Sequence, residues 1–172
     1  YYIDINDNLT FLPNNFFIWT SEKKGYNHIF LKGLDGSEEQ LTKGSWEVTS
    51  FDGLDSDKMQ IFYRSTEDGS TNRSLYMLDL ETGQKEKLST QIGTNSVKFS
   101  KGLKYYINTY SNANTPPIYS LHKSDGSLVK IIEDNTEFTN KINEYNLSQK
   151  EIFTIYTEKA DLNAWIIKPS NF

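Results

Sequence analysis

The hydrophobic residues of this chain fall in short aromatic and β-branched bursts that recur at a nearly constant interval. The central residues of the first set are 45, 44 and 47 positions apart: Phe17, Phe62, Tyr106 and Phe153. A second set follows about a dozen residues later, with first residues 46, 43 and 46 positions apart: Ile29, Leu75, Ile118 and Ala164. Runs of this composition are typical of strands. The pattern therefore predicts a repeated unit of strands about 45 residues long.

Each of the first three units continues with a glycine turn and a further short strand. The turns are Asp35-Gly36, Thr82-Gly83 and Asp125-Gly126, and the strands that follow them are predicted at residues 39–42, 85–89 and 128–132. The strands that open a unit are predicted at residues 48–54 and 96–99. Four strands in a repeat of this length are typical of a β-propeller blade. A β-sandwich with strands every ~8–12 residues is the alternative, but it explains repetition at three aligned landmarks less well.

The predicted fold class is therefore all-β: a partial β-propeller of about three blades, followed by a short helix and a β-hairpin. A closed propeller has at least about four blades, so we expect the chain to be a piece of a larger propeller. We place the blades in residues 1–135 and the exit from the propeller in residues 136–172.

The exit segment departs from the repeat. Phe138, Ile142 and Tyr145 stand at helical spacing, which predicts a short helix near residues 137–143. Two strand-like runs follow, with a connection short enough for a hairpin. We expect residues 152–156 to pair with 164–168 in an antiparallel hairpin and not to complete a blade.

The composition of the chain limits the kinds of molecule that it is expected to bind. The chain is 14% aromatic, and its sixteen Asn and ten Gly supply turns between strands. Eighteen basic against 23 acidic residues give a net charge of -5 without a basic block, so nucleic acid and anionic membranes are unlikely partners. The longest apolar run is four residues, 16–19, far short of the roughly 20 that a transmembrane helix needs. The absence of Cys excludes disulfides and thiolate chemistry.

Candidate catalytic and metal sites are weak. No Gly-x-Ser-x-Gly nucleophile turn occurs in the chain. His28 and His122 lie 94 positions apart without ligand-spaced neighbours, and we interpret both as hydrogen-bonded structural residues. Residues 4–8 resemble the opening of a calcium loop, but Leu9 and Asn15 stand where that loop needs Gly and Glu. We therefore assign no catalytic, substrate-binding or metal-binding residue and no cofactor.

Other polar groups have structural interpretations. Three aspartates are expected to form a solvated cluster on a loop tip: Asp52, Asp55 and Asp57. Three glycosylation sequons carry no weight in a chain this rich in Asn, and they begin at Asn8, Asn72 and Asn146.

A series of local motifs resembles one known family. The motifs are Gly25-Tyr26-Asn27-His28-Ile29, Lys43-Gly44-Ser45-Trp46-Glu47-Val48, Asn72-Arg73-Ser74-Leu75-Tyr76, Phe99-Ser100 with Lys104-Tyr105-Tyr106, Pro117-Ile118-Tyr119-Ser120-Leu121-His122 and Glu133-Asp134-Asn135. In this order they resemble the late propeller region of the dipeptidyl peptidase IV branch of the prolyl-oligopeptidase family. The resemblance runs from about Phe16 to the C-terminus, and the motif at residues 43–48 is the most specific.

The resemblance implies an eight-bladed propeller that caps an α/β-hydrolase domain with a Ser-Asp-His triad. Residues 1–135 would be its C-terminal blades, and 136–172 the exit helix and first strands of a truncated hydrolase domain. The triad would lie beyond Phe172, and the glutamates that grip the substrate amino terminus would lie upstream of Tyr1. The chain would then be a non-catalytic piece of a serine dipeptidyl peptidase that removes X-Pro dipeptides, with the propeller gating substrate access.

The resemblance further implies peptide substrates for the parent enzyme and a periplasmic or secreted location, and it leaves a homo-oligomer open. The lack of Cys is closest to the bacterial branch. A stand-alone propeller that binds a peptide or protein partner is the alternative.

Individual residues carry little of the family's function. Glu38-Glu39 follows a glycine turn and does not match the short helical motif of the family's glutamate pair. The resemblance gives Trp46 a packing role between blades and makes Glu47 a hydrogen-bond partner of a nearby turn. Leu41 and Val48 flank the same junction.

Overall fold

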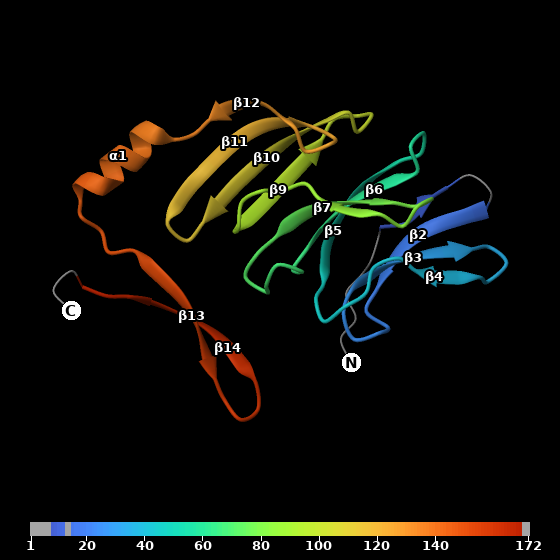
Figure 1. The fold of residues 1–172 in the computed structure, drawn as a ribbon, viewed down its shortest axis with the longest axis horizontal. Helices are drawn as coiled ribbons and strands as arrows, with labels where there is room; N and C mark the ends of the chain where they lie inside the picture. Colours follow the sequence, from blue (N-terminus) through green and yellow to red (C-terminus); the bar gives the residue numbers. More distant parts are fainter. Residues whose placement is uncertain (1–7, 13–14, 170–172) are drawn as a thin grey trace.

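The computed structural model describes residues 8–12 and 15–169. Its strands form three four-stranded antiparallel sheets that follow one another along the chain, and a helix and a separate two-stranded sheet come after them (Figure 1). Within each four-stranded sheet every strand pairs with the next strand in the sequence. This meander is the arrangement of a propeller blade, and it confirms the predicted all-β, partial-propeller fold. Residues 4–7 of the calcium-like segment lie outside the described residues.

The three blades have the following strands. The first contains β1 (Thr10–Phe11), β2 (Phe16–Ser21), β3 (His28–Gly33) and β4 (Glu38–Gln40). The second contains β5 (Val48–Asp55), β6 (Gln60–Ser65), β7 (Ser74–Asp79) and β8 (Lys85–Lys87). The third contains β9 (Thr94–Phe99), β10 (Tyr105–Asn112), β11 (Thr115–Lys123) and β12 (Leu128–Glu133). The first three bursts of the first set are thus the second strands of the blades, and the first three of the second set are the third strands; the fourth member of each set lies in the hairpin that follows.

The outermost strands of the first two blades end earlier than predicted. Thr42 and Ser89 were placed in these strands, but they lie just beyond the ends of the regular strands at Gln40 and Lys87. Here a side-chain hydroxyl is the acceptor: the Ile29 N–H donates to Thr42 Oγ1 at 2.9 Å, and the Leu75 N–H donates to Ser89 Oγ at 3.1 Å. Backbone bonds continue alongside, since the N–H groups of Leu41 and Leu88 donate to the Ile29 and Leu75 carbonyls, both at 2.9 Å.

The second blade packs on both faces. Successive side chains of a strand point to opposite faces, so Ile61 and Tyr63 of β6 join the core shared with the first blade, whereas Phe62 joins the core shared with the third. All three side chains are buried. On the third-blade side, the Phe62 ring lies 4.7 Å from that of Phe99. We call these two interfaces the first junction and the second junction.

Hydrogen bonds join the blades at equivalent points of the repeat. At the first junction the Val48 N–H donates to the Asn27 carbonyl at 2.8 Å, and the Asn27 side chain donates back to the Val48 carbonyl at 2.7 Å. At the second junction the Asn95 N–H and the Asn95 side-chain amide both donate to the Arg73 carbonyl at 2.9 Å. In both cases the first strand of one blade is fastened to the loop before the third strand of the preceding blade.

The exit segment forms the predicted helix and hairpin. Helix α1 spans Thr136–Glu144, and β13 (Lys150–Tyr156) pairs antiparallel with β14 (Asp161–Ile167). This pair forms its own two-stranded sheet, which confirms that it does not complete the third blade. Asn135 precedes the helix in the left-handed region, at φ 56°, and its side chain donates to the Pro117 carbonyl.

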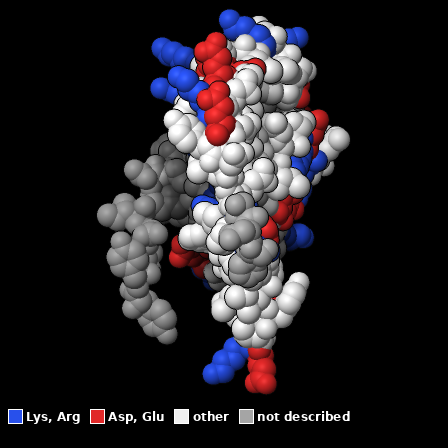
Figure 2. All heavy atoms as spheres, turned by 90° about the vertical axis from the view of Figure 1, so that its left-hand side faces the viewer, with Lys and Arg blue, Asp and Glu red and all other residues white. Residues whose placement is uncertain are grey.

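The hairpin is fastened to the blades by asparagine side chains. The Asn114 side chain donates to the Lys150 carbonyl at 2.9 Å and accepts from the Lys150 N–H at 2.8 Å. Asn163 of β14 donates to Ser70 Oγ at 2.6 Å. The face of the molecule toward α1 and the hairpin has a broad uncharged area between charged groups of both signs (Figure 2). Among the described residues, no helix has the length and hydropathy needed to cross a membrane.

Candidate functional site

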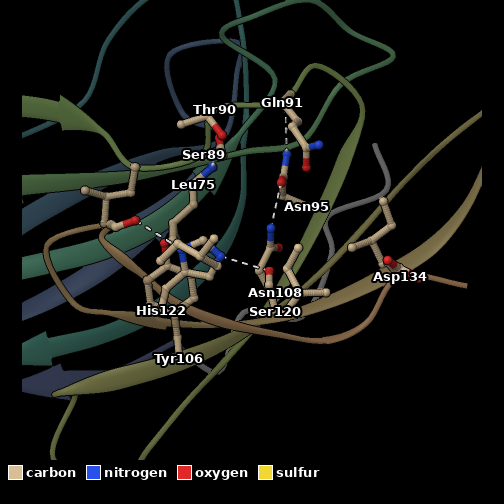
Figure 3. Close-up of a pocket in the computed structure, with 15 residues that line it drawn as sticks. Leu75, Ser89, Thr90, Gln91, Asn95, Tyr106, Asn108, Ser120, His122 and Asp134 are labelled. Carbon is tan, nitrogen blue, oxygen red and sulfur yellow. Dashed lines mark hydrogen bonds between the residues drawn. The ribbon is translucent and has the colours of Figure 1, made fainter. Parts of the chain in front are cut away.

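A groove of about 360 Å³ lies at the second junction, where the connection from β8 to β9 passes over the third blade (Figure 3). Its walls are apolar and come from both blades: Leu75, Leu88, Ile118, Leu128 and Ile131. Polar and aromatic side chains complete the lining, among them Ser89, Asn95, Tyr106, Asn108, Ser120, His122 and Asp134. Apolar walls with a few placed polar groups are typical of small-ligand sites. We call this site the inter-blade groove.

A chain of amides lies along the groove (Figure 3). Asn108 Nδ2 donates to Asn95 Oδ1 at 3.0 Å, and Asn95 Nδ2 donates to the carbonyls of Arg73 and Gln91. Because every amide nitrogen in this chain faces an acceptor, the orientation of both side chains is set. Asn108 Oδ1 is left buried and without a hydrogen-bond partner within the described part of the chain. A buried acceptor of this kind costs folding free energy until a donor reaches it.

Ser120 and His122 form a hydrogen-bonded pair on one face of β11. The Gly126 carbonyl lies 3.0 Å from His122 Nδ1, and because a carbonyl only accepts, Nδ1 carries the proton. Nε2 is then an acceptor, and Ser120 Oγ donates to it at 2.8 Å. The imidazole stacks on the Tyr106 ring, with the ring centres 5.0 Å apart. Ser120 therefore offers only its lone pairs to the groove.

One carboxylate, that of Asp134, gives the groove its negative charge. Among the lining residues in the described part of the chain, Asp134 is the one that carries a formal charge when His122 is the neutral tautomer described above. Hydrogen bonding from Thr136 holds the pKa of the Asp134 carboxyl below its usual range. Burial, together with the charge of Asp125, raises the pKa of Tyr106 to about 12. The groove thus carries a neutral phenol and a negative carboxylate at neutral pH.

His28 lies in the first blade, far along the chain from the groove, and is fully hydrogen-bonded. Its side chain is buried, with Nδ1 3.1 Å from Thr42 Oγ1 and Nε2 3.1 Å from the Gly44 carbonyl. Its ring lies nearly perpendicular to that of Trp46, with the ring centres 4.9 Å apart. Both ring nitrogens of His28 and of His122 therefore have a hydrogen-bond partner within the blades, as we expected from the sequence.

The acidic cluster is not a single loop tip, and the prediction was wrong for Asp52. Asp52 lies within β5 and accepts from Arg64 Nε at 2.9 Å and Nη2 at 2.8 Å. Asp55 accepts from the backbone N–H groups of Asp57 and Lys58, both at 3.1 Å, and so orders the turn after β5. Arg64 of β6 pairs with Ser50 of β5, and a register shift between Phe51 and Gly53 leaves Asp52 outside the ladder with its carboxylate bound to the Arg64 guanidinium. No group of three or more potential metal ligands occurs among the described residues.

Trp46 lies at the first junction, as the packing role requires, but its ring is only partly buried. It contacts His28 of the first blade, and Lys85 Nζ of the second lies 5.8 Å from the ring centre. Gly44 has φ 147° and sits against the indole, where a Cβ would collide with the ring. The motif at residues 43–48 therefore needs both its glycine and its tryptophan.

Glu47 is a hydrogen-bond partner of a nearby turn, as expected, and it acts through its backbone. Its backbone, rather than its carboxylate, holds the turn: the Glu47 N–H donates to Thr66 Oγ1 and its carbonyl accepts from the Thr66 N–H, both at 2.9 Å. The side chain itself is exposed. Any residue type can make these backbone hydrogen bonds, so the sequence does not predict them.

Glu38 has a local structural role. It forms ion pairs with Lys23 and Lys32 on the surface of the first blade. Hydrogen bonding from Lys23 holds the pKa of the Glu38 carboxyl below its usual range. Of the sequons, Asn72 donates to the Asp68 carbonyl at 2.8 Å, and Asn146 is exposed after α1.

The polar residues of the inter-blade groove were not predicted. Asn95 and Asn108 stand in no sequence motif, and the motif that contains Ser120 assigned it no role in a site. The signal that could have found them is the repeat: Asn108 and Ser120 are polar at positions where the second blade has Tyr63 and Tyr76, 45 and 44 residues earlier.

Comparison with known proteins gives consistent results. The family model described as "Dipeptidyl peptidase IV (DPP IV) N-terminal region" matches residues 1–117. The chain is 32% identical over 163 residues to dipeptidyl peptidase 4 of Trichophyton equinum, and 31% identical over 163 residues to that of Arthroderma otae. Each match covers 91% of this chain and 21% of the relative, so the chain spans about a fifth of the length of these relatives.

Solved structures show the same similarity. Dipeptidyl peptidase 4 of Porphyromonas gingivalis superposes with a TM-score of 0.87 at 38% identity, over 96% of this chain and 24% of that one. A dipeptidyl aminopeptidase IV structure from Bacteroides ovatus superposes with a TM-score of 0.80 over 95% of this chain and 26% of that one. At 21% identity the second match supports the fold alone.

Proposed function

The chain belongs to the family of the dipeptidyl peptidase IV N-terminal region, and we propose that it forms the last blades of the propeller of a serine-type dipeptidyl peptidase. The observation that carries the proposal is the extent of the similarity to the Porphyromonas gingivalis enzyme, which covers 96% of the chain. That extent takes in α1 and the hairpin as well as the blades.

We assign residues 1–135 to the propeller and 136–172 to the exit helix and the first strands of an α/β-hydrolase domain. Two features of the hairpin support this division. Its apolar side chains are exposed on both faces, including Ile152, Phe153, Trp165 and Ile166. A two-stranded hairpin is marginally stable alone, so a strand pair of this composition is suited to a larger sheet.

In this proposal the blades do no covalent chemistry. The parent enzyme removes X-Pro dipeptides from peptide amino termini by acyl transfer at a Ser-His-Asp triad in its hydrolase domain. The contribution of this chain is a rigid wall that restricts access to that site. Interlocked cores at two junctions and the hydrogen bonds between blades provide the rigidity. The proposal places the enzyme in the periplasm or outside the cell, and leaves open its assembly into a homo-oligomer.

The alternative is a propeller that binds a partner without catalysis, and the inter-blade groove is the observation that favours it. The two functions differ in what the complete gene encodes. The peptidase requires a Gly-x-Ser-x-Gly turn followed by Asp and His after the propeller, whereas the binding module does not.

The test compares this chain with the product of the complete gene. Both are assayed with a glycyl-prolyl chromogenic substrate and with a fluorophosphonate probe that labels activated serines. We expect turnover and labelling of the complete product and neither for the 172-residue chain. Turnover that follows the purified 172-residue chain, or a complete product that lacks both activities while folded, would contradict the proposal.

A further inference from the structure

The two junctions are equivalent in the repeat but differ at their centres. In the second blade Tyr63 of β6 lies opposite Tyr76 of β7, and in the third blade Asn108 of β10 lies opposite Ser120 of β11. Both pairs occupy the same place in the ladder, since Tyr63 also faces Phe51 of the first strand and Asn108 faces Val97. The tyrosine pair is part of the core of the first junction, and the Asn108–Ser120 pair lines the groove at the second.

At the first junction two aromatic rings fill this place. The rings of Tyr63 and Tyr76 stack with their centres 5.6 Å apart and 18° between their planes, and both side chains are buried. A smaller groove of about 230 Å³ remains beside them. Its wall includes Leu41 and Thr42, which correspond to Leu88 and Ser89 of the inter-blade groove.

At the second junction the same place holds an amide and a hydroxymethyl group. Protein interiors are normally close-packed, yet Asn108 and Ser120 leave a groove of about 360 Å³ here. This volume is within the range of ~300–1,000 Å³ that small-ligand sites have. The space exists because two phenol rings of the repeat are missing, so the shape that fits it is that of an aromatic ring.

The polar groups decide the charge of the ligand. Ser120 presents lone pairs, and among the described lining residues Asp134 alone carries a formal charge. These are acceptors or negative, so they favour a ligand that brings N–H groups and a positive charge. By contrast, the groove at the first junction is lined by two cations, Lys43 and Lys85.

We propose that the inter-blade groove binds a small aromatic amine. The ring occupies the place that Tyr63 and Tyr76 fill at the first junction, between the leucine walls of the second blade and the isoleucines of the third. The ammonium group lies toward Asp134, at the opposite end of the groove from His122 (Figure 3). This inference is independent of the peptidase proposal, because none of its residues takes part in peptide cleavage there.

The test uses 2-phenylethylamine as the probe and 3-phenylpropionate, which has the same ring and opposite charge, as the matched control. Binding is followed by NMR on the ¹⁵N-labelled 172-residue chain through the Asn95 and Asn108 side-chain amide signals. We expect saturable shifts with the amine, with a Kd on the order of 1 mM for a ligand of so few atoms, and none with the carboxylate.

Two variants locate the site. Asp134→Asn keeps the turn-forming side chain but removes the charge, and should weaken amine binding about three- to tenfold. Asp35→Asn is its control, because Asp35 accepts from Ser37 in the first blade as Asp134 accepts from Thr136. Ser120→Tyr restores the residue of the repeat, and should fill the groove and weaken binding more than tenfold while the chain stays folded.

Several results would overturn the proposal. They are equal shifts by the amine and the carboxylate, no saturable shift up to about 10 mM amine, or unchanged affinity in Asp134→Asn. If Ser120→Tyr does not fold, Asp134→Asn and its control alone decide the outcome.

Discussion

Replacement of Trp46 by alanine tests how the first two blades are held together. The indole packs against the core of the first junction, its ring centre lies 4.9 Å from that of the nearly perpendicular His28 ring, and Lys85 Nζ is 5.8 Å from its centre. His28 belongs to the first blade and Lys85 to the second. Removal of the ring therefore loses contacts on both sides of the junction at once.

The size of the effect follows from the partial burial of the ring. A fully buried Trp→Ala change costs about 3–5 kcal/mol. Because part of the Trp46 indole faces solvent, we expect about 1.5–3 kcal/mol of free energy of unfolding to be lost. The edge contact with His28 accounts for about 0.5–1.5 kcal/mol of this. For a domain of this size, a loss of about 2 kcal/mol lowers the Tm by about 4–8 °C.

The assay is urea and thermal unfolding of the chain followed by far-UV circular dichroism, since the mutation removes a fluorophore. Trp165→Ala is the matched control: that indole is 64% exposed on the hairpin, and its removal should change the free energy of unfolding by less than about 0.5 kcal/mol. Equal Tm values for Trp46→Ala and Trp165→Ala would refute the inter-blade packing role.

Two further predictions concern the hairpin and a turn. Asn114→Ala removes both hydrogen bonds to the Lys150 backbone; we expect faster amide hydrogen exchange throughout residues 150–167 with the Tm of the blades unchanged, and equal exchange in wild type and variant would contradict the anchoring role. Asp79 accepts from the Thr82 backbone and hydroxyl, which lowers the pKa of its carboxyl in the folded state. Its stabilising contribution is therefore present above the unfolded-state pKa of about 4 and is lost as the pH falls through the lower folded-state value. The Tm of wild type should fall more steeply below about pH 4 than that of Asp79→Asn, and parallel profiles would rule out this contribution.

The repeat, the blade strands and the exit hairpin were determined by the sequence alone, because each depends on contacts between neighbours in the chain. A meander pairs every strand with the next, so Phe62 and Leu75 can be placed on adjacent strands from their spacing and from the turns around them. The helical spacing of Phe138, Ile142 and Tyr145 likewise predicted α1 to within about two residues. The family motifs then related these blades and the hairpin to one family of propellers.

Only the tertiary structure decided three other features: the inter-blade groove, the ion pair of Asp52 with Arg64 and the extent to which Trp46 is buried. Asn108 and Ser120 leave a groove because they face the second blade across a junction, and the local sequence around them describes only their own strands. In the sequence Asp52 is one of three neighbouring aspartates, but the irregular pairing of β5 and β6 brings the Arg64 guanidinium to it alone. Burial depends on how two sheets are set against each other, and that geometry is a property of the packed blades rather than of any one segment.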